Sequence, residues 1–207
     1  MHAETTHLTH LLYLHGFRSS PQSAKAQQTR AWFATNYPEV VVEIPALPPS
    51  PHEAAQFMQA ILNNWPQRSL AVMGSSLGGY YASWVSAQWH CPAVLLNPAV
   101  NPARDLQAYI GEQTAWHNPE EAFYFKPEYI EQLRELDCAN NAATAPQLAL
   151  IAQGDEVLDW QEMVQRYPHA KRIVLEGSNH ALSDTFESHL PEIADFLYRL
   201  GQPASAI

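Results

Sequence analysis

Short apolar runs recur along the chain, and stretches with helical character lie between them. The runs are nearly continuous in apolar residues and do not alternate with polar ones, which is typical of strands covered on both faces of a sheet. Strands are therefore expected at residues 11–14, 40–44, 70–73, 94–96, 148–152 and 172–175, and helices at residues 24–35, 52–64, 77–88, 160–166 and 186–200.

One strand and one helix alternate through most of the chain, which indicates right-handed βαβ units. The expected fold is therefore α/β, with about six mainly parallel strands and helices on both faces of the sheet. The interval from 98 to 146, directly after Asn97, breaks the alternation. Roughly fifty residues separate two strands there, where a crossover needs a dozen or more. This insertion is either a lid or binding element, or a segment that covers one sheet face.

Weaker local signals complete this picture. Within the insertion, helical pieces are expected at 104–110 and 127–136. Residues 202–207 are expected to form a frayed tail.

Length, composition and charge narrow the class of protein. The 207 residues, 46% hydrophobic and 15% charged, are expected to form one globular domain over residues 1–207. The formal charge of −10 argues against a nucleic-acid partner, which needs a positive surface. No apolar run is long enough for a membrane span, and no secretory signal is visible. The two cysteines, Cys91 and Cys138, suit a reducing cytoplasm.

The clearest chemical signal is Gly-Ser-Ser-Leu-Gly at residues 74–78, between an expected strand and an expected helix. This G-x-S-x-G pattern in that context is the nucleophile elbow, which presents its central serine at a sharp turn. Ser76 is therefore the expected nucleophile, whereas Ser75 is off the centre of the pattern. A chance glycine turn with an ordinary N-capping serine is the competing interpretation.

A serine nucleophile needs a base and an acid. In α/β-hydrolases both follow the serine along the chain, the acid first and then the histidine. Asp155 follows the strand at 148–152 and is the expected acid. Glu156 and Asp159 are neighbouring alternatives, although Asp159 could instead cap the next helix. Asp184 would need a loop that folds back.

The expected base is His180, because it alone among the late histidines follows the last strand. His169 precedes that strand and so lies at the opposite sheet edge, and His189 falls within the last helix. Asp155 would hold His180 in the tautomer that accepts the serine proton.

Two backbone N–H groups are expected to stabilise the oxyanion. One belongs to Leu77, after the nucleophile, and the other to Phe17, in the loop after the first strand. His15 is expected to shape this loop through hydrogen bonds. Arg18 could meet an anionic substrate group or remain solvated.

Several other residues are weaker candidates. Tyr80 and Tyr81 on the helix after the elbow, and the aromatic run 123–125 that begins with Phe123, are either core residues or pocket residues. Spare histidines on a polar N-terminus explain His2, His7 and His10 better than a metal site does. The two cysteines lack zinc-ligand spacing, and no metal is expected.

Six sequence blocks occur in the order YLHGFRSSPQSAKA, IPALPPSP, MGSSLGGYYASW, LLNPAVNPARDL, GDEVLDWQEMVQRY and EGSNHALSDTFE. Together they resemble the bacterial YqiA-type esterases of the α/β-hydrolase superfamily, over nearly the whole chain. The resemblance implies a carboxylesterase that needs no cofactor, with Ser76, Asp155 and His180 as its triad. It also suggests acyl thioesters such as acyl-CoA as substrates. The segment 112–136 departs from the family pattern.

The predicted function is therefore hydrolysis of small-molecule carboxylic esters or thioesters through an acyl-enzyme. Two alternatives remain: an amide or peptide hydrolase on the same triad, and a non-catalytic binding protein on the same fold. A polyanionic acyl-CoA would need a local basic mouth on this acidic chain, for which Arg18, Lys25 and Arg104 are candidates.

Overall fold

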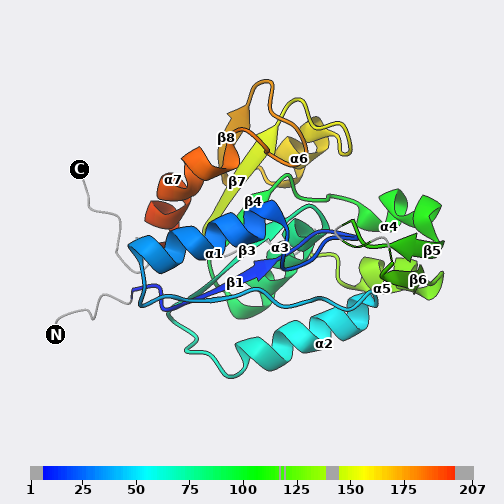
Figure 1. The fold of residues 1–207 in the computed structure, drawn as a ribbon, viewed down its shortest axis with the longest axis horizontal. Coiled ribbons are helices and arrows are strands. Elements are labelled where there is room, and N and C mark those ends of the chain that lie inside the picture. The colour runs from blue at the N-terminus through cyan, green and yellow to red at the C-terminus, as the bar shows by residue number, and fades with distance from the viewer. Residues whose placement is uncertain (1–6, 117, 119, 139–144, 199–207) are drawn as a thin grey trace.

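The computed structural model describes residues 7–116, 118, 120–138 and 145–198 (Figure 1). His2 and the predicted frayed tail at 202–207 lie outside the described residues. No helix in the described part of the chain is both long and apolar enough to cross a membrane.

A six-stranded parallel sheet forms the centre of the fold, as predicted. Its order is β2-β1-β3-β4-β7-β8, so the chain reverses direction across the sheet between β1 and β3. In doubly wound sheets ligands bind outside the carboxyl ends of the strands near such a reversal. The strands are β1 (His10–Leu14), β2 (Val41–Glu43), β3 (Leu70–Ser75), β4 (Ala93–Leu96), β7 (Gln147–Ala152) and β8 (Lys171–Leu175).

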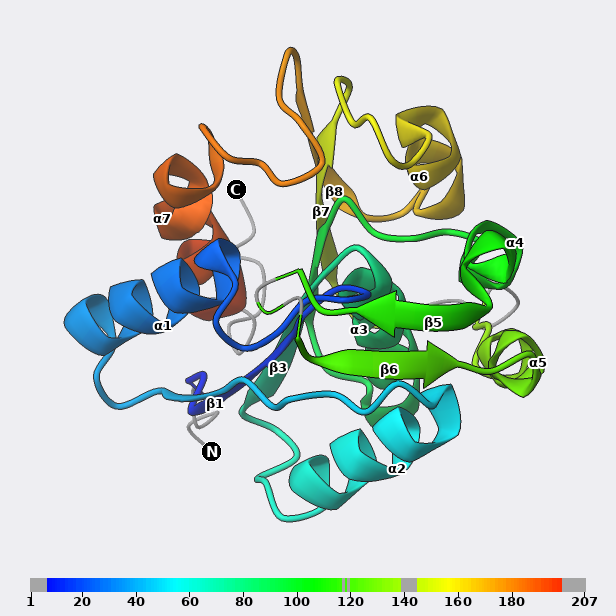
Figure 2. The same ribbon diagram turned by 45° about the vertical axis from the view of Figure 1, so that its right-hand side comes forward.

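Helices cover both faces of this sheet (Figure 2). Alternate side chains of each strand point to opposite faces, so Leu11 and Tyr13 enter one core layer while Leu12 and Leu14 enter the other. The first layer is closed by α1 (Ala24–Asn36) and α7 (Phe186–Tyr198), and the second by α2 (Pro51–Leu62), α3 (Leu77–Trp89), α5 (Glu128–Glu135) and α6 (Trp160–Arg166).

Local signals set where two of these helices begin. Pro51 occupies the first turn of α2, and the Ser50 hydroxyl before it accepts a hydrogen bond from the Glu53 N–H at 3.3 Å. The carboxylate of Asp159 caps α6 in the same way, accepting from the Gln161 N–H at 2.8 Å. Both caps satisfy backbone donors that the first turn of a helix leaves without partners.

The edge strands depart from the prediction that every strand is covered on both faces. Val41 of β2 is 49% exposed and Val174 of β8 is 40% exposed. Each of these strands has a neighbour on one side, whereas β1, β3, β4 and β7 lie inside the sheet. The apolar runs of β2 and β8 therefore predicted the strands correctly, but these two edge strands are not buried on both faces.

The insertion contains an element that the sequence did not predict. After α4 (Pro102–Asp105) and the short 3-10 helix Gln107–Tyr109, which replace the helix expected at 104–110, an antiparallel hairpin forms from β5 (Gly111–Thr114) and β6 (Ala122–Phe125). Arg18 Nε donates to the Thr114 carbonyl at 2.7 Å, which fastens this hairpin to the loop after β1. The hairpin therefore lies over the carboxyl edge of the sheet.

Candidate active site

The turn between β3 and α3 holds Ser76 in a strained conformation, with φ 57° and ψ −121°. A side chain at positive φ is uncommon and is found where the surrounding structure enforces it. Two glycines permit the close backbone packing around it: a Cβ at Gly74 would lie 2.0 Å from the Gly78 carbonyl oxygen, and a Cβ at Gly78 would lie 2.0 Å from the Leu14 carbonyl oxygen. The chain can make this sharp turn because both positions lack a side chain.

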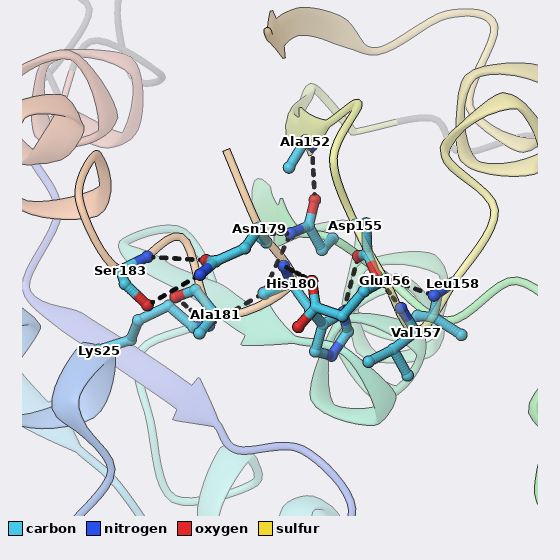
Figure 3. Close-up of polar contacts among 11 residues, drawn as sticks. Lys25, Ala152, Asp155, Glu156, Val157, Leu158, Asn179, His180, Ala181 and Ser183 are labelled. Atoms are coloured by element: carbon cyan, nitrogen blue, oxygen red, sulfur yellow. Dashed lines mark hydrogen bonds and ion pairs between the residues drawn. The ribbon is translucent and has the colours of Figure 1, made fainter. Parts of the chain in front are cut away.

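The loops after β7 and β8 bring Asp155 and His180 together. His180 Nδ1 lies 2.7 Å from Asp155 Oδ2, and the Asp155 side chain is fully buried while that of His180 is 20% exposed (Figure 3). The other carboxylate oxygen of Asp155 accepts from the N–H groups of Val157 and Leu158, each at 2.8 Å. Three nitrogen atoms therefore fix the carboxylate orientation, and His180 is left with its other nitrogen available for a partner.

The alternative acids have other partners. Glu156 Oε2 accepts from the backbone N–H of His180 at 3.0 Å, and this hydrogen bond holds the pKa of Glu156 below its ordinary value. Asp159 caps α6, and Asp184 is exposed. Among the four carboxylates considered from sequence, Asp155 is the one in contact with the His180 ring.

The loop after β1 packs directly against the elbow. A Cβ at Gly16 would lie 3.1 Å from Ser76 Cβ, so the loop approaches the serine as closely as glycine allows. Phe17 follows Gly16 in the chain, and both residues line the same cavity as Ser76. Leu77 begins α3, and the first N–H groups of a helix have no intrahelical acceptor. That the N–H groups of Phe17 and Leu77 stabilise an oxyanion stays a prediction.

His15 and Arg18 fix this loop through different contacts. His15 is buried, and its Nε2 accepts from the Leu47 N–H at 3.2 Å. Arg18 has φ 59°, and its guanidinium carbon lies 4.1 Å from the centre of the Trp116 ring. The Trp116 backbone N–H in turn donates to the Arg18 carbonyl at 2.8 Å. These contacts join the loop after β1 to the segment before α2 and to the hairpin.

Two adjoining cavities meet at this loop and share the lining residues 15–17 and Ser19. The first, of about 280 Å³, is lined largely by apolar side chains, among them Phe17, Leu47, Leu77 and Phe123. The second, of about 270 Å³, is lined by Ser76, His180, Lys25 and Trp116 among others. Ser76 and His180 thus line one cavity, and a largely apolar cavity opens beside it.

Of the four side chains singled out as candidates for lining the site, His15, Arg18 and Phe123 line the first cavity. Tyr80 does not: it is buried, and its hydroxyl donates to the Leu133 carbonyl of α5. Its neighbour Tyr81 lines the cavity instead. Successive helical residues point in directions about 100° apart, so the sequence could not decide between the two tyrosines.

Three further residues lie at the site although the sequence did not predict them there. Asn97, Lys25 and Trp116 contact the loops or line the cavity that carries Ser76 and His180. Asn97 directly follows β4, and this position at a strand's carboxyl end was the available signal. Lys25 was considered only as a cation for an anionic substrate, and Trp116 had no distinguishing pattern.

His7, His10 and the two cysteines are the other residues that the sequence raised as candidate metal ligands. His7 stacks on Tyr198 and His10 lies 4.9 Å from the ring centre of Trp65. Cys91 and Cys138 are buried free thiols. Within the residues that the structure describes, no three His, Cys, Asp or Glu side chains are arranged to hold a metal ion.

Comparisons with known proteins agree with this architecture. The model of an uncharacterised protein family, UPF0227, matches residues 10–198, which confirms the family resemblance drawn from the sequence blocks. Est1E from Butyrivibrio proteoclasticus, solved with ferulic acid, is similar at 15% identity and a TM-score of 0.74, over 93% of this chain and 89% of that one.

Two further solved structures are similar at the same level. The mouse alpha/beta hydrolase domain-containing protein 10 has 15% identity and a TM-score of 0.72, over 91% of this chain and 89% of its own. The esterase domain of a Rhodothermus marinus protein has 17% identity and a TM-score of 0.68, over 96% and 90%. These similarities establish the α/β-hydrolase fold.

Proposed function

Because the chain belongs to the UPF0227 family and has the α/β-hydrolase fold, we propose that it is a serine hydrolase that cleaves carboxylic esters. The observation that carries the proposal is the 2.7 Å contact between His180 Nδ1 and the buried Asp155 carboxylate, in a loop that lines the same cavity as Ser76. A buried carboxylate that fixes one imidazole nitrogen leaves the other to act as a base.

In the proposed reaction, Ser76 Oγ attacks the ester carbonyl carbon while His180 Nε2 accepts the hydroxyl proton. The negative charge that develops on the carbonyl oxygen is stabilised by the N–H groups of Phe17 and Leu77. The tetrahedral intermediate collapses, the bond to the leaving alcohol breaks, and His180 returns its proton to that alcohol. Water then attacks the acyl-enzyme with His180 as base, which releases the acid and restores Ser76.

The apolar cavity suits the acyl part of the substrate. It opens beside the oxyanion donors, and Phe17, Leu77 and Phe123 contribute to its walls. A volume of about 280 Å³ lies near the lower end of the range for small-molecule sites and favours a short aliphatic or single-ring acyl group. Ferulic acid, the ligand of the structurally similar Est1E, is a single-ring carboxylic acid.

The cations do not favour a large polyanionic leaving group such as coenzyme A. Arg18 donates to Thr114 and stacks on Trp116, and Lys25 donates to the Ala181 carbonyl. Arg104 pairs with Glu162 through both terminal nitrogens, at 2.8 and 2.7 Å. Each candidate for a basic mouth is thus engaged within the protein, and the net charge of −10 repels polyanions. Uncharged oxygen esters are the preferred substrates.

A fluorophosphonate probe tests the proposed nucleophile, since it phosphonylates a serine that an adjacent base activates. The wild type is expected to be labelled and Ser76→Ala to remain unlabelled. Ser75→Ala is the matched control, because Ser75 is adjacent but lies at the end of β3. It is expected to be labelled as the wild type is. Labelling of Ser76→Ala at the wild-type rate would refute the assignment.

Esters, thioesters and anilides assayed side by side define the reaction class. The proposal expects p-nitrophenyl esters of short acids to be cleaved faster than the matching anilides. It also expects acyl-CoA to be cleaved more slowly than an uncharged thioester of the same acid. A preference for acyl-CoA that falls steeply with added salt would instead indicate a basic mouth.

A further inference from the structure

The loop that carries His180 is held by side chains from three other segments (Figure 3). Asn97 Nδ2 donates to the carbonyls of Asn179 and His180, at 3.2 and 3.0 Å. Glu156 accepts from the His180 N–H at 3.0 Å. Lys25 Nζ donates to the Ala181 carbonyl at 2.8 Å and lies 3.5 Å from the His180 carbonyl oxygen. The backbone of the catalytic histidine is thereby fixed on both sides.

Asn97 anchors the His180 loop to the central sheet. It is fully buried at the end of β4, and its Oδ1 accepts from the Ala152 N–H of β7 at 2.7 Å. It therefore links β4, β7 and the His180 loop, and a substitution there would disturb the sheet itself. An experiment on Asn97 would not separate folding from catalysis.

Lys25 is different because it comes from the first turn of α1 and lines the cavity that contains Ser76. Burial lowers the pKa of its ammonium to about 8, against the attraction of Asp155. The protein therefore keeps a cation where desolvation disfavours it. A neutral side chain of the same length would avoid this cost, so a role in the site explains the lysine better than a role in stability.

We propose that Lys25 is a positioning residue for the general base: its ammonium holds the Ala181 and His180 carbonyls, so that the imidazole keeps Nδ1 on Asp155 and presents its other nitrogen to the cavity lined by Ser76. This inference rests on the proposed esterase function. It assigns a role in the mechanism to a residue that does not touch the substrate's reacting atoms.

The charge of Lys25 matters as well as its length, because an ammonium donates a stronger hydrogen bond than a neutral amine. The titratable groups around it are Asp155 on the loop after β7, His180 and the nearby Glu156, and Tyr13 of β1. Loss of the Lys25 proton above about pH 8 is expected to loosen the loop and lower kcat.

The first test compares Lys25→Met with the wild type and with Lys171→Met, which removes an exposed lysine paired with Glu192 on the surface. With a short p-nitrophenyl ester, Lys25→Met is expected to lose about ten- to a hundredfold in kcat with little change in KM. The decline in kcat above about pH 8 should also disappear. Lys171→Met should behave as the wild type. Unchanged kcat, or a pH profile parallel to the wild type, would overturn the proposal.

A rescue experiment separates the ammonium from the bulk of the side chain. Lys25→Cys treated with 2-bromoethylamine regains an ammonium on a chain of lysine length, whereas treatment with iodoacetamide gives a neutral side chain. The two other cysteines are buried, and treated wild type controls for their modification. The proposal expects kcat to recover with the first reagent and not with the second. Equal kcat after the two treatments would overturn it.

Hydrogen exchange tests the holding of the loop without relying on activity. Amides at residues 178–182 are expected to exchange faster in Lys25→Met than in the wild type or Lys171→Met. Equal exchange in the three proteins would overturn the proposal even if the enzyme hydrolyses esters. If Ser76→Ala hydrolyses esters as fast as the wild type, the proposed function fails instead, and the inferred positioning of a base fails with it.

Discussion

His180 and Asp155 lie 25 residues apart in the chain, yet His180 Nδ1 and Asp155 Oδ2 are 2.7 Å apart. The contact exists because β7 and β8 are parallel neighbours, so the loops that follow them leave the sheet at the same edge. The buried carboxylate also accepts from Val157 and Leu158, which prevents it from turning away from the imidazole. The sheet topology therefore brings the proposed acid and base into contact.

Replacement of Asp155 by Asn should keep the fold but give His180 the wrong tautomer, because an amide can donate to Nδ1 where a carboxylate accepts from it. We expect kcat for ester hydrolysis to fall by roughly a thousand- to ten-thousandfold. Asp159→Asn is the matched control, since that carboxylate caps α6 and is expected to affect kcat by less than about twofold. Comparable losses in both variants would contradict the assignment of Asp155.

The wall formed by Phe123 should limit the acyl length. Phe123→Ala enlarges the apolar cavity, and we expect the preferred p-nitrophenyl ester to shift toward longer acyl chains. Tyr124→Ala provides the control, because Tyr124 is adjacent on β6 but 55% exposed. Its chain-length profile should match the wild type. An unchanged optimum in Phe123→Ala would place the acyl group elsewhere.

The elbow should tolerate no side chain at Gly78, because a Cβ there would lie 2.0 Å from the Leu14 carbonyl oxygen. Gly78→Ala is expected to lower the free energy of unfolding by about 3 kcal/mol or more, or to prevent folding. Urea unfolding measures this. Gln88→Ala, at an exposed position of the same helix, should change stability by less than about 0.5 kcal/mol. A Gly78→Ala protein as stable as the wild type would contradict the close packing of α3 on β1.

The lowered pKa of Lys25 makes stability depend on pH in a defined direction. Burial lowers this pKa from 10.5 to about 8, so between these values the unfolded chain binds more protons than the folded one. The contribution of Lys25 to the free energy of unfolding should therefore rise with pH across this window. Subtraction of the Lys25→Met curve isolates this contribution from those of other groups. A difference that stays flat or falls from pH 8 to pH 10.5 would contradict the burial of a charged lysine.

Much of the fold could be predicted because each element carries its own local signal. The six apolar runs correspond to β1, β2, β3, β4, β7 and β8, and the helix expected at 160–166 has those bounds in the structure. The β5–β6 hairpin was missed because β5 has the sequence GEQT, which has neither alternation nor apolar character. Its pairing with β6 and its contact with Arg18 stabilise it.

The candidate site also has residues that could be predicted from the sequence and residues that could not. Ser76, Asp155 and His180 each stand at the end of an expected strand, so one topological rule brings them to one edge of the sheet. The positions of Tyr80 and Lys25 depend on which helix face meets which loop, and a single sequence does not contain that information. Tertiary contacts decide these positions, as the Leu133 carbonyl does for Tyr80.

Turnover of esters shows whether Ser76 is the nucleophile of an ester hydrolase. We would measure hydrolysis of p-nitrophenyl esters from acetate to palmitate by the wild type, Ser76→Ala and Ser75→Ala. We expect turnover by the wild type and Ser75→Ala, a preference for short acyl chains, and a loss of at least about a thousandfold in Ser76→Ala. Equal rates in the wild type and Ser76→Ala would show that Ser76 is not the nucleophile.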